Sequence, residues 1–222
     1  MKQGDFLWLL ALCALSVVLL VPSTHQLFIK MTLDHPYLMG FVKFAILATM
    51  GELLAIRILS GQWKKTTGMI PKAIVWGAVG MLIVLMFEIY LNGVAGAVRK
   101  GLLYVGDGAV QSVLTAFFIS AIMNLTFAPA FMAAHRMTDL YIDMRSEGIR
   151  PEWSIIVANI DWQGFIKFVV AKTVPYFWIP AHTIVFLLPP EYRVLVAAYL
   201  SIALGAILAY ARRKKSEVSL AN

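Results

Sequence analysis

Five ionisable side chains lie inside apolar stretches of the chain. They are Lys43, Glu52, Glu88, Lys172 and His182. A charge at membrane depth costs about 2.5–3.5 kcal/mol on insertion scales, so such groups face the interior of a helix bundle and pair with one another. We expect Glu52 or Glu88 to pair with Lys172 or His182, and the five groups to line an ion- or proton-coupled pathway. The alternative is a polar lock that only holds the helices together.

A second set of chemically capable side chains shares one helical face through four-residue spacing: His135, Asp139, Asp143 and Glu147. The acidic part resembles half of the aspartate-rich motif of the UbiA-type membrane prenyltransferases, which implies Mg²⁺ held between carboxylates and a diphosphate. Our preferred interpretation is a solvated helix whose acids pair with Arg136, Arg145 and Arg150. On that interpretation the chain has no metal ligand.

Composition identifies the surroundings of these groups. The 222 residues are 60% hydrophobic and 14% charged, whereas soluble domains are about 45–50% apolar and about 25% charged. The single cysteine, Cys13, allows no internal disulfide and no cysteine-based zinc framework. The net charge of +7 therefore indicates Lys and Arg on the cytoplasmic side of a membrane protein, and not a nucleic-acid partner.

The apolar runs predict an all-α fold, a single integral membrane domain over residues 1–222 with about six spans of roughly 20 residues each. The predicted spans cover residues 6–22, 37–59, 72–98, 109–134, 164–188 and 194–211. We interpret the first as a retained span and not a cleaved signal. The charged segment 135–161 is predicted to be an exposed cytoplasmic loop with some amphipathic helix, which Gly148 and Pro151 would end. Pro175 and Pro180 predict that the fifth span is broken, because proline removes a helical hydrogen bond.

The distribution of Lys and Arg predicts that both termini lie inside. The cytoplasmic side receives Lys2, Arg57, Lys64, Lys65, Lys72, Arg136, Arg145, Arg150 and the tail Arg212, Arg213, Lys214 and Lys215. The far side receives only Lys30, Arg99, Lys100 and Arg193.

Small residues recur every four positions on two predicted spans, a pattern that lets helix backbones approach closely. The stripes are Ala116, Ser120 and Asn124 on one span and Ala197, Ser201, Gly205 and Ala209 on the last. They predict helix packing, and they are the faces through which a homo-oligomer would form.

The proline-rich segment carries a family resemblance. Its signature residues are Trp178, Pro180, Phe186, Pro190 and Arg193, with His182 between them. Together with His35-Pro36 and Gly51-Glu52 they resemble the Mpv-seventeen/PMP-twenty-two family of small integral membrane proteins, with a similar order and spacing over much of residues 35–211. The resemblance implies an all-helical bundle with channel- or pore-like activity.

These observations predict a channel or transporter for a small solute or ion, without catalytic residues or a cofactor. The alternatives are an intramembrane Mg²⁺-dependent enzyme that uses Asp139, Asp143 and Glu147 on a lipid or prenyl diphosphate, and a non-catalytic scaffold or assembly factor. The expected partners are the lipid bilayer and the solute. We expect a bacterial cytoplasmic membrane, because Asp5 in a short N-terminus without arginine is unlike a transit peptide.

Overall fold

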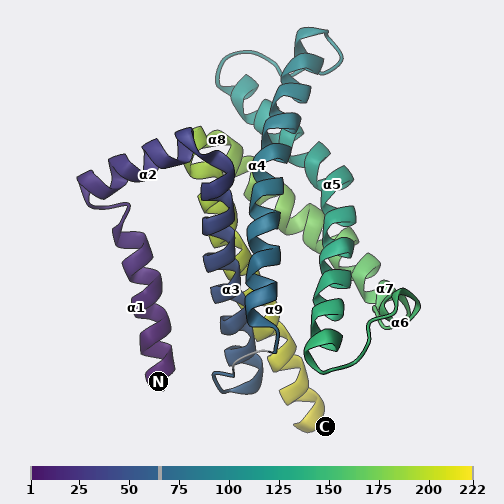
Figure 1. Ribbon diagram of the computed structural model, residues 1–222. Coiled ribbons are helices and arrows are strands. Elements are labelled where there is room, and N and C mark those ends of the chain that lie inside the picture. The colour runs from purple at the N-terminus through teal and green to yellow at the C-terminus, as the bar shows by residue number, and fades with distance from the viewer. Residues whose placement is uncertain (1, 65–66, 222) are drawn as a thin grey trace.

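The computed structural model describes residues 2–64 and 67–221, with only the backbone described at 211, 212 and 214–221. In these residues the fold is all-α, as predicted (Figure 1). The elements are α1 Gln3–Val17, α2 Pro22–Asp34, α3 Pro36–Ser60, α4 Met69–Arg99, α5 Gly108–Ser146, α6 Trp153–Ala158, α7 Trp162–Gly164, the π-helix η1 Phe165–Trp178, α8 Ile179–Leu187 and α9 Pro190–Ala221.

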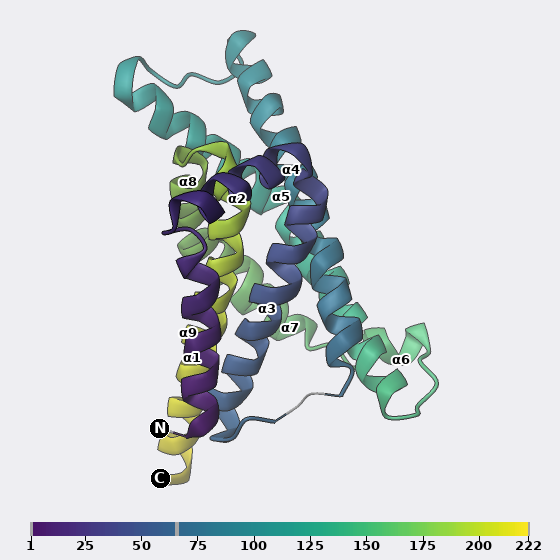
Figure 2. The same cartoon turned by 60° about the vertical axis from the view of Figure 1, so that its left-hand side comes forward.

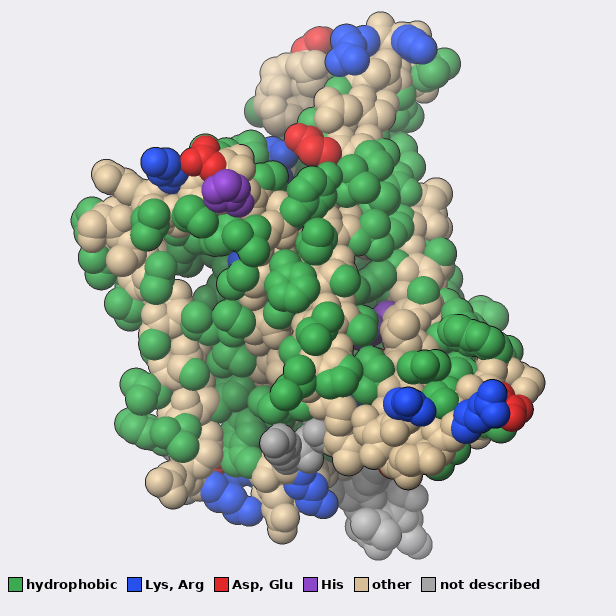
Figure 3. All heavy atoms as spheres, viewed as in Figure 1, with side chains coloured by type: hydrophobic (Ala, Val, Ile, Leu, Met, Phe, Trp, Pro, Cys, Tyr) green, Lys and Arg blue, Asp and Glu red, His purple; other side chains and the backbone are tan. Residues whose placement is uncertain are grey.

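The protein is an integral membrane protein. In the part that the structure describes, α3, α4, α5 and the stretch Pro190–Tyr210 of α9 are long and apolar enough to cross a bilayer, and a fifth span results if α1 and α2 count as one. Hydrophobic side chains cover the middle of the molecule, and Lys and Arg gather towards its ends (Figure 3). Length and composition thus identify four or five of the six predicted spans in the described residues, and the proline-containing segment of η1 and α8 is not among those counted.

The first predicted span, 6–22, is not one straight helix. Helix α1 ends at Val17, and α2 begins at Pro22 and bends away by 80°. Proline has no N–H to donate, and its fixed φ suits the first turn of a helix. Pro22 therefore starts a new helix and does not close the old one.

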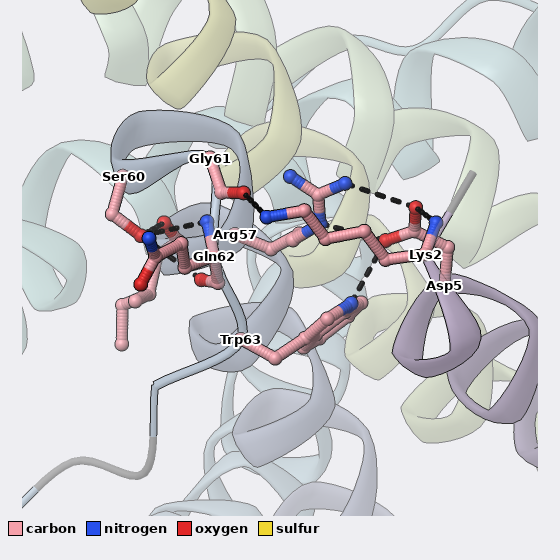
Figure 4. A network of polar contacts seen from close by, with 8 residues as sticks. Lys2, Asp5, Arg57, Ser60, Gly61, Gln62 and Trp63 are labelled. Atoms are coloured by element: carbon pink, nitrogen blue, oxygen red, sulfur yellow. Dashed lines mark hydrogen bonds and ion pairs between the residues drawn. The ribbon is translucent and has the colours of Figure 1, made fainter.

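Helix α1 lies at the edge of the bundle (Figures 1 and 2) and buries none of its residues. A polar network fixes its start (Figure 4): Arg57 donates two hydrogen bonds to Asp5, at 2.6 and 2.9 Å, and the Trp63 indole donates a third at 2.8 Å. Further along, the Trp8 indole donates to the Met50 carbonyl at 3.0 Å. These polar contacts hold the helix together with the partly buried Trp8, Leu12 and Leu15, which pack against the hydrophobic core.

Helices α3, α4 and α9 form the closely packed centre, where glycines let backbones touch. A Cβ at Gly51 would lie 3.2 Å from the Ile202 Cα, and Gly40 on α3 faces Gly80 on α4. Ala197 and Ala209 of the predicted α9 stripe are buried, as are Ala116, Ser120 and Asn124 on α5. Both predicted stripes thus pack inside this chain, so the homo-oligomer, which stays a prediction, would need other surfaces.

The amphipathic helix predicted within 135–161 is present and ends before Gly148, but it is the continuation of α5 and not a separate helix in an exposed loop. Helix α5 continues through Pro129 to Ser146 before Gly148, with φ +77°, ends it. The acidic face of this extension contacts side chains of α3 and α4, namely Glu52 and Lys72, and is only partly exposed to solvent. Only the stretch after Ser146, with the short helices α6 and α7, resembles the expected loop.

At the prolines the helix changes type and is not interrupted, so the predicted break takes the form of an irregular helix. Residues 165–178 form a π-helix containing Pro175, α8 follows at once, and the helix stops before Pro189. The wider π turns leave carbonyls for side-chain donors: the Thr173 hydroxyl donates to the Phe168 carbonyl at 3.1 Å, and Ser120 on α5 donates to the Ile179 carbonyl at 2.7 Å. Backbone groups freed in lipid need such partners.

Both termini lie at the same end of the bundle (Figures 1 and 2). The loop between α3 and α4 and the end of α5 are also there. This arrangement agrees with the predicted inside position of both termini. Lys65 of the predicted basic side lies outside the described residues, as do the side chains of Arg212, Lys214 and Lys215.

Candidate functional site

A cavity of about 250 Å³, partly open to the outside, lies between α3, α4, α5, η1, α8 and α9. Most of its lining is aromatic or aliphatic, including Phe44, Phe87, Phe127, Phe131 and Met132. Its ionisable lining side chains are His135, Arg136 and His182. The cavity is therefore an apolar chamber with polar groups at a few points, and the sequence-based expectation of a charge-lined cavity is wrong.

One end of this chamber is built around His182 of α8. The ring Nδ1 lies 3.0 Å from the side-chain nitrogen of Asn124 on α5, and the ring stacks on Trp178 with centroids 5.0 Å apart. Asn124 is 1% exposed and also donates to the Ser120 carbonyl at 2.9 Å. The side chain of Asn124 thereby ties the proline-containing segment to α5.

The other end of the chamber is built around His135 of α5. Asn124 and His135 are eleven residues apart, so the two ends are separated by about 16 Å along α5 at 1.5 Å per residue. The His135 ring lies 4.1 Å from the Trp76 ring of α4, centroid to centroid, and its Nε2 is 3.5 Å from Oδ2 of Asp139. The Trp76 indole donates to Oε1 of Glu52 on α3 at 2.7 Å.

Lys72 completes the polar cluster at this end. Its Nζ lies 2.7 Å from Oδ1 of Asp143, one turn beyond Asp139 on α5. The adjacent Arg136 lies over the Phe165 ring at 5.4 Å and lines the cavity. The predicted shared face of His135, Asp139 and Asp143 is therefore present, but it meets α3 and α4. The expected pairing with Arg136, Arg145 and Arg150 is replaced by Lys72, and Glu147 lies exposed beyond the end of α5.

Three side chains at this end, Glu52, His135 and Asp139, bring potential metal ligands together. Each offers one ligand atom, and these atoms lie within 4.8 Å of one another. Two of the cluster's atoms, Nδ1 of His135 and Oδ1 of Asp139, are buried and have no hydrogen-bond partner. Buried polar atoms are almost always hydrogen-bonded, so two orphans in one cluster require an explanation.

The predicted pore residues do not converge. Lys43 is 6% exposed and donates to the Thr32 hydroxyl at 3.0 Å, with its Nζ 4.5 Å from the centroid of the Phe28 ring. Glu88 and Lys172 are exposed on the outside of the molecule. The predicted pairing of Glu52 or Glu88 with Lys172 or His182 is wrong, since Glu52 binds Trp76 and His182 contacts Asn124.

The signature residues of the proline-rich segment lie along α8 and the start of α9. Trp178 lines the cavity, and its indole N–H is buried without a partner. Phe186 is 6% exposed, and the Arg193 guanidinium lies 5.9 Å from its ring centroid while donating to the Leu188 carbonyl at 2.9 Å. Pro190 begins α9.

Sequence reasoning missed Trp76, Lys72 and Arg136 as members of the site. A signal existed for the first two: Lys72 and Trp76 are four residues apart and share a face of α4, just as Asp143, Asp139 and His135 share a face of α5. When two such faces meet on neighbouring helices, the side chains of one can contact those of the other, as Lys72 contacts Asp143 and Trp76 contacts His135. Arg136 was expected to pair with the acids of its own helix, so no sequence signal showed that it lines the cavity.

The fold and the cavity define a helical integral membrane protein with an apolar chamber between its helices. Comparisons of the chain with models of protein families, with curated proteins and with solved structures find no match. The resemblance to the Mpv-seventeen/PMP-twenty-two family stays a prediction.

Proposed function

We propose that the protein transports a small amphipathic anion across the membrane through the apolar chamber. The proposal places it in a bacterial cytoplasmic membrane, with the His135 end of the chamber towards the cytoplasm. The observation that carries it is the cavity of about 250 Å³ between the helices, lined mainly by apolar side chains and reached by one guanidinium, that of Arg136. Ligand sites are typically apolar cavities with a few placed polar groups.

The two ends of the chamber favour an anionic head group and an apolar body. Arg136 offers a forked set of donors that matches carboxylate or phosphate oxygens. At the other end, the unpartnered N–H of Trp178 offers one more donor. Between them the lining is aromatic and aliphatic, which suits an alkyl or prenyl chain.

Flux of radiolabelled decyl phosphate in proteoliposomes tests the proposal, because the permanent charge of this probe prevents passive crossing. We expect Arg136→Gln and Met132→Trp, which fills the chamber, to lower protein-dependent flux at least about tenfold, equal to 1.4 kcal/mol. Met132→Leu and Lys172→Gln are the matched controls and should retain flux. Equal flux with empty liposomes, or unchanged flux in both test variants, contradicts the proposal.

The structure gives less support to the Mg²⁺-dependent enzyme. Asp143 is bound by Lys72, and Glu147 is exposed past the helix end, so two of the three expected ligands are not directed at a shared ion. Its discriminating observation remains a thermal stabilisation by Mg²⁺ that Asp143→Asn abolishes. The proposed transport function assigns the chain no catalytic residue.

A further inference from the structure

We propose that Glu52, His135 and Asp139 form a binding site for one borderline divalent metal ion, of which Zn²⁺ is the representative. The three side chains come from α3 and α5, and their ligand atoms lie within 4.8 Å of one another. The inference does not rest on the proposed transport function, since metal retention is measured without any solute.

The distances are close to those of a loaded site. An ion with Zn–N and Zn–O bonds of about 2 Å holds its ligand atoms roughly 3–4 Å apart. His135 Nε2 and Asp139 Oδ2 are already 3.5 Å apart. Glu52 lies no more than 4.8 Å from the other two ligand atoms, so it has to approach them by about 1 Å at most.

The orphaned atoms point to the same conclusion. Nδ1 of His135 and Oδ1 of Asp139 are buried without a partner, although the His135 side chain is only 14% exposed. A metal ion bound through Nδ1 and Oδ1 would give these two atoms the contact that no described protein group supplies, whereas an ion on the 3.5 Å pair of Nε2 and Oδ2 would leave Nδ1 without a partner. The hydrogen bond from Trp76 to Glu52, 2.7 Å long, is the type of second contact that orients a ligating carboxylate.

The charge balance of the cluster also favours a cation. Three carboxylates, Glu52, Asp139 and Asp143, belong to this cluster, and Lys72 is in ion-pair contact with one of them, Asp143. Arg136 lies over the Phe165 ring. Two half-buried carboxylates brought close together favour a cation or a shared proton between them.

The donor set selects the class of metal. Imidazole suits Zn²⁺, Fe²⁺ and Ni²⁺, whereas Mg²⁺ and Ca²⁺ prefer sites made of oxygen alone. One imidazole with two carboxylates therefore favours a borderline ion over Mg²⁺. Three protein ligands leave a coordination position open, as in catalytic zinc sites. His135 also lines the chamber, so that position is next to the space in which the chamber would hold a molecule.

The test is zinc retention by the full chain, purified in detergent after removal of any histidine tag. We expect about one Zn²⁺ per chain by elemental analysis after desalting, and at least a tenfold weaker affinity in Asp139→Asn and His135→Gln, measured by competition with a chromophoric chelator. His35→Ala, which removes an exposed histidine, and Glu88→Gln are the controls and should bind like the wild type.

A second readout uses the unaltered protein, so a variant that fails to fold cannot decide the question. Co²⁺ should give a visible ligand-field spectrum and quench the fluorescence of Trp76, whose ring lies 4.1 Å from that of His135; Trp76→Phe should lose this quenching. Retention of zinc no greater than in Asp139→Asn, or preference for Mg²⁺ over Zn²⁺, overturns the inference. If Glu52 and Asp139 share a proton and bind no metal, the wild type retains no more zinc than Asp139→Asn.

Discussion

Two histidines line the same chamber, and their surroundings differ in one respect. His182 contacts the amide of Asn124, which is itself buried and fixed by Ser120. His135 lies among an indole and two carboxylates, and its Nδ1 has no partner. The hydrogen bond between His182 and Asn124 joins α8 to α5, whereas Nδ1 of His135 is free to bind a further group. A polar group at membrane depth can therefore hold helices together or form a binding site. A group whose hydrogen bonds are all made within the bundle does the first, and a group with an unpartnered atom can do the second.

The largest expected effect is a stabilisation by zinc that depends on His135 and does not depend on the His182 contact. Zinc at one hundred times its Kd should stabilise the wild-type chain by about 2.7 kcal/mol, because it binds the folded state alone. His135→Gln should lose this gain, and Asn124→Leu should keep it. The measurement is unfolding in mixed micelles of dodecyl sulfate, followed by tryptophan fluorescence. A gain that persists in His135→Gln would remove the distinction.

Asn124→Leu tests the helix contact at His182. The substitution leaves Nδ1 of His182 without its amide partner inside the bundle, so we expect a loss of about 1–3 kcal/mol in the free energy of unfolding. Asn92→Leu is the matched control, since Asn92 is exposed and its side chain donates to Glu88 of its own helix. Equal losses in both variants would show that the contact with His182 contributes nothing.

Lys72→Met tests how the positive charge beside the His135 cluster affects stability and zinc binding. The ion pair with Asp143 is partly exposed, with 39% of the Asp143 side chain accessible, so its loss should cost about 1 kcal/mol or less. The same change removes a positive charge beside Glu52 and Asp139, so zinc should bind several-fold more tightly. Chelator competition measures the affinity, and weaker binding would contradict the assignment of the cluster as a cation site.

The smallest expected effect belongs to Glu88→Gln. Glu88 is exposed on α4 and belongs to neither end of the chamber. The free energy of unfolding should change by no more than about 0.5 kcal/mol, as for most surface substitutions. Unfolding in the same mixed micelles checks this, and a large loss would mean that Glu88 has a role in the bundle.

Sequence reasoning predicted much of the fold. The apolar runs identified α3 and α4 to within a few residues, and the prolines identified the irregular segment around Pro175. It failed at the end of α5. The predicted span ended at residue 134, whereas the helix continues through a charged stretch to Ser146 and packs on its neighbours. Hydropathy detects contact with lipid, and it does not detect helix packing beyond the lipid.

Part of the site was also predictable. Glu52 and His182 were selected correctly as groups inside the bundle, and the shared face of His135, Asp139 and Asp143 follows from spacing alone. Their partners were not predictable. Trp76 and Asn124 carry no charge, so a search for opposite charges does not find them, and Glu88 was selected although it faces outward.

The sequence by itself determined the class of this protein: helices long and apolar enough to cross a bilayer, an irregular helix at the prolines, and basic residues gathered at the end with both termini. Local chemistry decides these features, because backbone hydrogen bonding, proline and the cost of charge in lipid act within a single segment. Only the tertiary structure decided which groups meet. Glu52 reaches His135 through the rotation of α3 and α5 about their axes, and the packing of ridges and small residues across the whole bundle fixes that rotation.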